Sequence, residues 1–230
     1  VETTKDLLPS QAGSGQVAYV TSTESVYMFT NGSWKPQKKY SVNLKDYPRL
    51  SSDTTDDGRF SRAIADLTLL SIKTITGLSA YSQQEIVIPA GILEVSNAIQ
   101  IPNQAVIRSE GQTIIRQSDP TKNIFNCIDG FLLRVKGVKF FGGKHQIYFE
   151  NPNYDATVII FENLEFWDSS DYAIKTLGTG TADSHLSAYA VAIDCKFSGC
   201  KRILYNVCDK FVFRGGWLYL YKKNYDANTA

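Results

Sequence analysis

The chain has 230 residues, with 24 Lys or Arg against 23 Asp or Glu, so its formal net charge is only +1. This balance excludes the strongly basic field typical of nucleic-acid-binding proteins. No stretch reaches the roughly 20 apolar residues of a membrane-spanning helix, and no signal peptide is visible. Aromatic residues make up 12% of the chain. Together with the many Val, Ile and Thr residues they favour pleated, half-buried sheet surfaces, which indicates a β-rich protein.

Residues 1–40 are expected to form a small β-module. Apolar residues alternate with a period of two in residues 16–20 and again in 25–29, and an Asn-Gly pair at 31–32 suits a tight turn before the next short run. Three such runs with one apolar face predict a β-meander. The alternative interpretation is an irregular N-terminal arm.

Residues 41–80 are expected to contain a connector and a helix. Asp56 and Asp57 mark the helix start, because carboxylates there accept hydrogen bonds from free backbone amides and interact favourably with the helix dipole. We interpret both as caps, not as catalytic groups. The following apolar residues have helical spacing and predict a face able to cover the end of a stack of strands: Phe60, Ala63, Ile64, Leu67, Leu70 and Ile72.

Residues 81–230 predict a succession of short strands. Several apolar runs are bounded by Gly, Pro, Asn or Ser, at 85–88, 92–95, 98–101, 105–108 and 113–116. A loose repeat follows, centred on Phe140, Phe166, Phe197 and Leu218, with uneven spacings of 26, 31 and 21 residues. Uneven spacing is typical of coils that share one cross-section and carry loops of different lengths.

The repeat also predicts a column of charge. Strict alternation turns Phe140 inward and Lys139 outward. If the coils stack, Lys139, Glu165 and Lys196 align on the exterior with alternating sign, because neighbouring strands lie only about 4.8 Å apart. We interpret this column as a structural ladder.

The order of these features resembles the start of the β-helix in pectate-lyase-like proteins, and most closely in bacteriophage tailspikes. The resemblance rests on an acidic turn that opens a helix, SDTTDDGRFSRAI at 52–64, and on the strand and turn IVIPAG at 86–91. The family's acidic pair is present, but its upstream glycines are replaced by Leu-Ser-Ser at 50–52. The resemblance implies an all-β fold: a right-handed parallel β-helix (solenoid) with an N-terminal capping α-helix and a small β-meander before it.

The resemblance also implies a function. Tailspikes are virion proteins of the phage tail, assembled in the host cytoplasm, that depolymerise a bacterial capsule or O-antigen polysaccharide. The implied partners are this polysaccharide, two further copies in a homotrimer, and other tail or baseplate proteins through residues 1–40. No nucleic acid, membrane, metal or cofactor is implied. We also expect more chain beyond the strand at 217–221, because its edge would otherwise stay unpaired.

Four cysteines, Cys127, Cys195, Cys200 and Cys208, match no paired metal-ligand spacing. They are expected to be reduced, structural thiols.

Glycan hydrolysis needs two carboxyl groups about 5 to 10 Å apart. The predicted catalytic residues are Glu162, Asp168, Asp171 and Asp194, chosen from a wider acidic set that includes Glu150, Glu165 and Asp183. Asp168 and Asp171 lie in an acidic and aromatic segment, although an Asp/Ser turn is the alternative. Glu162 and Asp194 precede successive Phe-bearing repeats and are expected to lie about one coil apart.

Sugar rings stack on aromatic faces, so Trp167 and Tyr172 are predicted to bind substrate. His185 joins them because it lies in the Gly-, Thr- and Ser-rich loop at 176–187. His145 and His185 are possible bases, with solvated surface histidines as the alternative. A lyase would instead use a base such as Lys139, Lys196 or Arg214.

Two other functions stay open. A non-catalytic adhesin or structural spike would bind glycan without cleaving it, and the lack of any diagnostic catalytic motif favours it. A cellular pectin-type glycosidase or lyase would need secretion, against which the missing signal and the expected thiols argue.

Overall fold

The computed structural model describes residues 13, 16–20, 25–30, 33–36, 41–67, 73–75, 78–80, 84–128, 132–150, 157–178 and 186–219. The chain divides into two compact units, Val1–Lys39 and Tyr40–Ala230. The described residues contain one α-helix, and most of the others lie in strands. No helix among them is long and apolar enough to cross a bilayer.

The first unit contains a three-stranded antiparallel sheet of β1 (Val17–Val20), β2 (Ser25–Thr30) and β3 (Ser33–Pro36). Phe29 is buried, and its ring meets Trp34 edge-on at a centroid distance of 5.5 Å. This sheet is the meander that the alternation predicts. The predicted turn at 31–32 lies outside the described residues.

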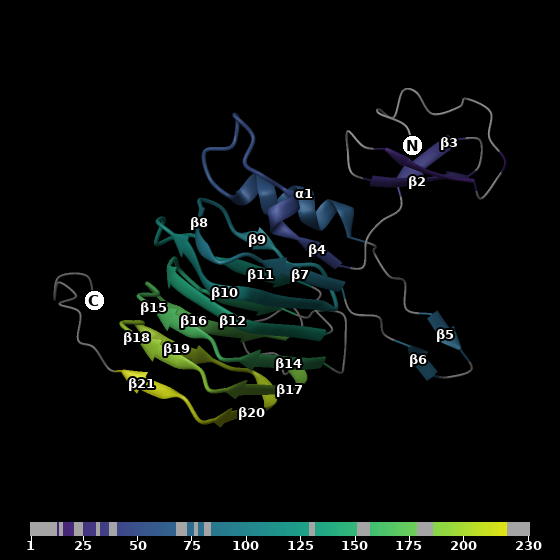
Figure 1. The fold of residues 1–230 in the computed structure, drawn as a ribbon. Coiled ribbons are helices and arrows are strands. Elements are labelled where there is room, and N and C mark those ends of the chain that lie inside the picture. Colours follow the sequence, from purple (N-terminus) through teal and green to yellow (C-terminus); the bar gives the residue numbers. More distant parts are fainter. Residues whose placement is uncertain are drawn as a thin grey trace. The chain divides into compact units, whose positions relative to one another are not determined.

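In the second unit, apart from one short antiparallel pair at 73–75 and 78–80, strands of successive coils pair in parallel (Figure 1). The pairings form three ladders. Ladder A has the order β20-β17-β14-β12-β10-β7-β4. Its strands are β4 (Ser41–Asn43), β7 (Gln84–Ile88), β10 (Ala105–Gln117), β12 (Leu132–Gly142), β14 (Thr157–Glu162), β17 (Leu186–Ile193) and β20 (Cys208–Arg214).

Ladders B and C follow A along each coil. Ladder B joins β8 (Gly91–Val95), the C-terminal halves of β10 and β12, β15 (Glu165–Trp167), β18 (Lys196–Ser198) and β21 (Trp217–Tyr219). Ladder C has the order β19-β16-β13-β11-β9, made of β9 (Ile99–Gln100), β11 (Phe125–Ile128), β13 (Ile147–Glu150), β16 (Tyr172–Leu177) and β19 (Arg202–Tyr205). The second unit is therefore built of long parallel ladders, consistent with a β-solenoid.

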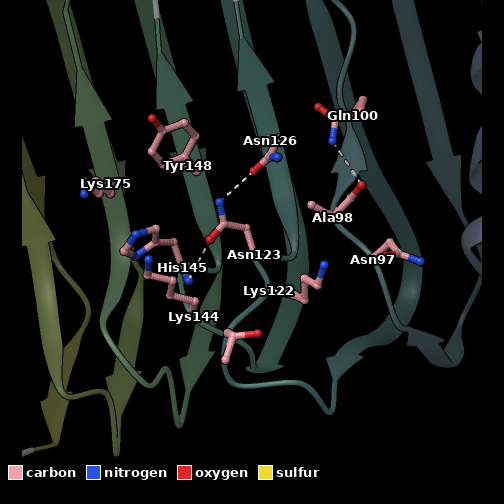
Figure 2. A pocket seen from close by; sticks show the side chains of 11 residues that line it. Asn97, Ala98, Gln100, Lys122, Asn123, Asn126, Lys144, His145, Tyr148 and Lys175 are labelled. Carbon is pink, nitrogen blue, oxygen red and sulfur yellow. Dashed lines mark hydrogen bonds between the residues drawn. The ribbon is translucent and has the colours of Figure 1, made fainter. Parts of the chain in front are cut away.

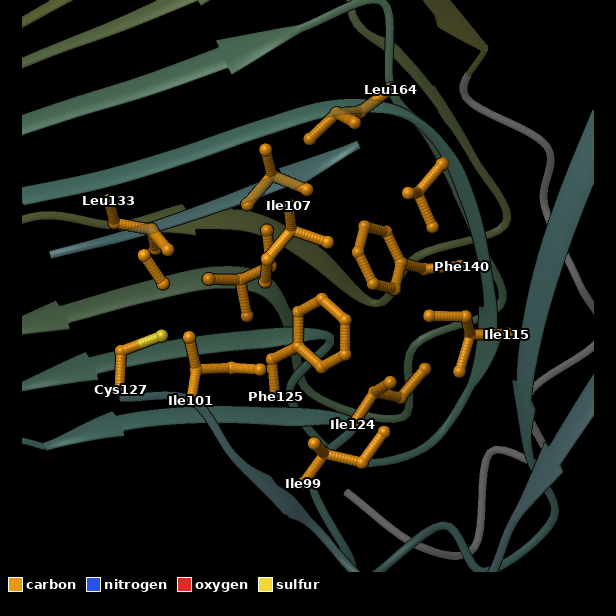
Figure 3. Packing of buried hydrophobic residues seen from close by; sticks show 14 of the residues in the cluster. Ile99, Ile101, Ile107, Ile115, Ile124, Phe125, Cys127, Leu133, Phe140 and Leu164 are labelled. Carbon is orange, nitrogen blue, oxygen red and sulfur yellow. The ribbon is translucent and has the colours of Figure 1, made fainter. Parts of the chain in front are cut away.

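The core is stacked in register from coil to coil. In ladder B, Phe140 aligns with Phe166, which aligns with Phe197 and then Leu218, so the predicted repeat is confirmed. The ring centroids of Phe140 and Phe166 are 5.4 Å apart, and those of Phe166 and Phe197 are 4.9 Å apart. Phe125 from ladder C meets Phe140 edge-on at 5.1 Å, inside the buried cluster of Figure 3. Such aromatic pairs each contribute about 0.5–1.5 kcal/mol beyond the burial of their area.

The predicted charge column is also confirmed. Lys139 aligns with Glu165, and Glu165 with Lys196, on the outer side of ladder B. The Glu165 carboxylate lies 3.3 Å from Lys139 Nζ and 3.1 Å from Lys196 Nζ. The next residue in register is Trp217, which ends the alternation of charge.

Helix α1 (Asp57–Asp66) lies beside β4 and β9 (Figure 1). It starts where predicted, and its buried Phe60 ring lies 6.5 Å from Phe125. It ends earlier than its apolar spacing suggests, since Leu67 already has an extended backbone. Leu70 and Ile72 lie outside the described residues.

The predicted capping role of Asp56 is wrong. Asp56 makes no side-chain cap hydrogen bond, because its backbone (φ −83°, ψ 0°) is helical instead of extended as at a usual N-cap. Its side chain is 2% exposed, and its carboxylate accepts hydrogen bonds from Arg49, from Arg59 and from the backbone N of Glu94 at 2.8 Å. Asp57 likewise binds the next coil, accepting from the backbone N of Ser96 at 3.1 Å. Both acidic residues therefore attach the helix to its neighbours.

Two short elements complete the second unit. A 3-10 turn, η2 (Leu44–Asp46), follows β4, and β5 (Lys73–Ile75) pairs with β6 (Leu78–Ala80) as an antiparallel hairpin. The four cysteines are free thiols, with Cys200 half-buried and the other three buried. Burial raises the pKa of the Cys195 thiol to about 11, so it stays protonated at neutral pH.

Candidate functional site

A groove of about 540 Å³ lies on the outer face of ladder C (Figure 2). Strand alternation creates it. Ile99, Phe125 and Ile147 point into the core in register. On each of five coils, the residue that follows the inward one points outward. These outward residues form a column of Gln100, Asn126, Tyr148, Lys175 and Tyr205. Neighbouring members belong to strands about 4.8 Å apart.

A second column lies three residues earlier on each coil. Its members are Asn97, Asn123, His145, Tyr172 and Arg202, of which Tyr172 and Arg202 pair directly. Backbone and side chains join successive members: His145 N donates to Asn123 Oδ1 at 3.3 Å, and Tyr172 N donates to His145 Nδ1 at 3.4 Å. The two columns together form a floor of amides, aromatic rings and cationic groups.

Contacts between the two columns orient the side chains of the groove. Asn123 Nδ2 donates to Asn126 Oδ1 at 2.8 Å, as the dashed line in Figure 2 shows. The imidazole of His145 stacks on the ring of Tyr148 at 5.9 Å, with planes 16° apart. Tyr148 Oη donates to Glu150 Oε2 at 2.8 Å. Burial and this hydrogen bond raise the pKa of Tyr148 to about 12, so the phenol remains a hydrogen-bond donor at neutral pH.

His145 is neutral at physiological pH. Its side chain is only 3% exposed, and burial lowers its pKa to about 4, helped by Lys175 and Lys144 and opposed by Asp171. Since Nδ1 accepts the Tyr172 amide, the proton of the neutral ring is assigned to Nε2. Nε2 faces Asp171 Oδ2 at 3.9 Å. The ring therefore offers a donor toward Asp171, and neither nitrogen is a free base.

A second hollow of about 430 Å³ adjoins the groove and shares Thr121 and Lys144 with it. It adds Asp171, Lys201 and Arg202 to the lining. Arg202 Nη1 lies 3.0 Å from Tyr172 Oη and 3.4 Å from Asp171 Oδ1, and its guanidinium lies 5.1 Å from the centroid of the Tyr172 ring. The arginine thus contacts both the hydroxyl group and the ring of Tyr172 at the edge of the groove.

The structure separates the predicted catalytic residues. Of the four, only Asp171 lines a hollow described above, and it lines the second one. Asp168 lies at a turn between ladders B and C with φ +56°, and its Oδ1 would be 2.1 Å from a Cβ on Gly199 of the next coil. This geometry matches the turn interpretation of Asp168, because Asp and Asn tolerate the left-handed conformation better than most residues.

Glu162 and Asp194 lie near the turn between ladders A and B. Glu162 aligns with Ile193, so Asp194 is one position further along the next coil. Glu162 accepts from Arg134 at 2.6 Å, whereas Asp194 is exposed and adopts φ +51°. The four predicted acids therefore occupy two different corners of the coil.

The other predicted residues divide in the same way. Tyr172 lies in the groove column, whereas Trp167 lies on the outer side of ladder B, 41% exposed, with its Nε1 donating to Glu165 at 3.3 Å. The lyase candidates Lys139 and Lys196 belong to the charge column, and Arg214 ends β20. His185 and Asp183 lie outside the described residues.

Most groove residues were not predicted as ligands, although a sequence signal for them exists. Five segments, one per coil, share the order polar, any, apolar, polar: NAIQ at 97–100, NIFN at 123–126, HQIY at 145–148, YAIK at 172–175 and RILY at 202–205. The polar positions differ in identity from coil to coil, so the repeat is visible only as a pattern. Among the described residues, no group of three or more His, Cys, Asp and Glu could hold a metal ion.

No protein-family model and no curated protein matches this sequence. A solved structure, ORF18 of Geobacillus virus E2, aligns over 83% of this chain with 17% identity and a TM-score of 0.38. The aligned region spans 47% of that protein, so this chain covers about half of its length. The likeness is too distant to support a conclusion about fold or function.

Proposed function

We propose that this protein is a right-handed parallel β-helix of the tailspike type, which binds a bacterial surface polysaccharide along the groove of ladder C. One observation carries the proposal: the same pair of outward positions recurs on five coils and forms one continuous polar and aromatic surface. A linear array of repeated positions suits a linear, repeating ligand. The resemblance of residues 52–64 and 86–91 to the tailspikes supports the same function.

The side chains suit sugars. Amide groups such as those of Asn123 and Asn126 can both donate to and accept from hydroxyl groups, and the rings of Tyr148 and Tyr172 offer faces to the C–H surfaces of a sugar ring. In this proposal α1 covers the end of the β-helix. The protein acts as a homotrimer in the phage tail, and residues 1–40 contact other tail or baseplate proteins.

Binding, without hydrolysis at this groove, is the first candidate. Besides Asp171, the groove region has Glu150, which is bonded to Tyr148. Asp171 N donates to Lys144 O, so Asp171 lies beside Lys144 on the neighbouring coil. Lys144 is six residues before Glu150 in the sequence. At about 3.3 Å per residue the two carboxylates are roughly 15–20 Å apart. Hydrolysis requires about 5–10 Å.

Cleavage of the bound chain is the second candidate, and the approach of Asp171 to His145 at 3.9 Å favours it. Asp171 would be the acid or base, with His145 Nε2 as a donor beside it. The cleavage site of a tailspike can also lie outside this groove. For such a site, we propose Glu162, Asp168 and Asp194 as the catalytic residues.

The test is binding to an array of purified capsular and O-antigen polysaccharides, followed by mass spectrometry of every bound chain. Tyr148→Ala should abolish binding. Tyr189→Ala, which truncates a 39% exposed tyrosine on ladder A, is the matched control and should bind normally. Fragments heavier by one water per cut would show hydrolysis, and unsaturated fragments a lyase. If no polysaccharide binds, or both tyrosine variants bind like the wild type, the proposed function is wrong.

A further inference from the structure

The groove and the adjoining hollow carry an excess of positive charge. Their lining contains five basic side chains, Lys122, Lys144, Lys175, Lys201 and Arg202, against a single acidic one, Asp171. The whole chain has a net charge of only +1. The positive charge is therefore concentrated on this face of the second unit.

The contrast with the other ladders is sharp. On ladders A and B, most of the described basic side chains are matched by carboxylates from neighbouring coils, such as Arg108 by Glu85 at 2.7 Å, Arg134 by Glu162 at 2.6 Å, and Lys139 by Glu165 at 3.3 Å. On ladder C, no described carboxylate lies within ion-pair distance of Lys122, Lys144 or Lys175. Stacked coils can place acids beside bases, as Asp171 beside Arg202, but among the described residues none is placed beside these three lysines.

Two of these amines, those of Lys144 and Lys175, act on the same imidazole. Lys144 and Lys175 both disfavour the cationic form of His145, which lies between them in the groove (Figure 2). Lys175 Nζ lies 5.5 Å from the ring centroid of Tyr205. Clustered like charges repel one another unless a counter-charge is bound. The arrangement is stabilised when an anionic ligand occupies the groove.

Resting on the function proposed above, we propose that the bound polysaccharide is acidic and carries carboxylate groups of the uronic-acid type. Lys122, Lys144 and Lys175 bind these carboxylates, while the amides of Asn123 and Asn126 bind hydroxyl groups. Arg202, which already contacts Asp171 at 3.4 Å, can add a charge-assisted contact to a carboxylate, since its planar fork matches two carboxylate oxygens. A neutral glycan would leave three amines uncompensated in the complex.

The test compares each acidic polysaccharide that binds on the array before and after its carboxyl groups are reduced to alcohols. This arm uses the unmodified protein, so it does not depend on the folding of a variant. We expect reduction to weaken binding at least about tenfold, because several charge-assisted contacts are lost together. Equal binding of the native and reduced chains, or binding of neutral chains only, would overturn the acidic ligand and leave the proposed function standing.

A second arm tests the site. Lys122→Gln/Lys144→Gln/Lys175→Gln should lose at least about tenfold in affinity for the native acidic chain. The control, Lys45→Gln/Lys136→Gln/Lys210→Gln, removes three charges that lie outside the groove and should bind within about twofold of the wild type. Equal losses in both variants would show a general charge effect and contradict the groove as the site.

Two competitors complete the design. Double-stranded DNA and dextran sulfate are added to the complex of the unmodified protein with the acidic polysaccharide. Neither should displace the polysaccharide at a matched concentration of anionic groups. Displacement by DNA would indicate a nucleic-acid ligand, and displacement by dextran sulfate a sulfated one, and either result would overturn the proposal. Loss of all polysaccharide binding on the array would overturn the proposed function as well.

Discussion

His145 Nε2 lies 3.9 Å from Asp171 Oδ2, on successive coils of the second unit. This distance is too long for a hydrogen bond, yet short enough for attraction if the imidazole were charged. The pKa of His145 nevertheless falls to about 4, because burial and the nearby Lys175 and Lys144 outweigh the favourable effect of Asp171. The balance keeps an uncharged imidazole at the centre of a positively charged groove.

This balance predicts a pH-dependent stability. The His145 pKa is about 4 in the folded state and about 6.5 when the chain unfolds, so the unfolded chain takes up the proton first as the pH falls. Above about pH 6.5, the neutral ring makes its full contribution to the free energy of unfolding. It is lost between about pH 6.5 and 4, by about 3 kcal/mol, since each unit of pKa difference corresponds to about 1.4 kcal/mol. Denaturant unfolding at several pH values should show this slope, and His145→Gln should reduce it. An imidazole that titrates near pH 6.5 by NMR would contradict the prediction.

Asp56 is expected to be essential for the stability of the helix region. Its buried carboxylate accepts from Arg49 and Arg59 and from the backbone of Glu94. Asp56→Ala leaves these donors without their acceptor and should cost about 2–4 kcal/mol in the free energy of unfolding. Glu110→Ala is the control, because it removes a more exposed ion pair with Lys45 and should cost clearly less. Equal costs, measured by urea unfolding, would show that the Asp56 contacts add nothing.

The stacked phenylalanines allow a matched pair of variants. Phe166→Ala removes a fully buried ring between Phe140 and Phe197 and should cost about 3–5 kcal/mol. Phe141→Ala removes a 40% exposed ring from the outer side of the same ladder and should cost less than about 1 kcal/mol. The two thermal unfolding midpoints should therefore differ clearly. Similar midpoints would mean that the alternation in β12 and β15 is not as described.

Asp168 is expected to act through its backbone conformation. Asp168→Asn and Asp168→Gly both permit φ +56° and should change stability by less than about 1 kcal/mol, whereas Asp168→Val should destabilise the protein by about 1–3 kcal/mol. Thermal unfolding of the three variants checks this. The Asn variant also tests catalysis, because it keeps the turn and removes the carboxylate. If the protein cleaves its polysaccharide and Asp168→Asn abolishes cleavage, Asp168 is catalytic after all.

The sequence predicts the parts of this fold that repeat with the same residue type. Phe140, Phe166 and Phe197 recur in equivalent positions, so both their stacking and the charge column beside them followed from strand alternation. Ladder C repeats just as regularly, but its outward positions change from amide to imidazole, phenol, amine and guanidinium. No residue type recurs often enough there to reveal the groove.

The acidic residues show a second reason for the difference. Asp168 and Asp171 are three residues apart and look equivalent in sequence, yet one adopts a left-handed turn and the other lines the hollow beside the groove. At Asp56 a helical backbone conformation turned a predicted cap into an acceptor for two arginines. In each case the backbone dihedral angles decide where the carboxylate points, and sequence spacing does not specify those angles.

Because the coils of ladder C stack in register, the length of the groove grows in equal steps. Every coil adds one member to each column, at steps of about 4.8 Å. Duplicating one whole coil, such as the one that carries His145 and Tyr148, would extend the floor by one step without altering the cross-section of the core. If the groove binds a glycan as proposed, the number of coils sets how many sugar units are bound at once.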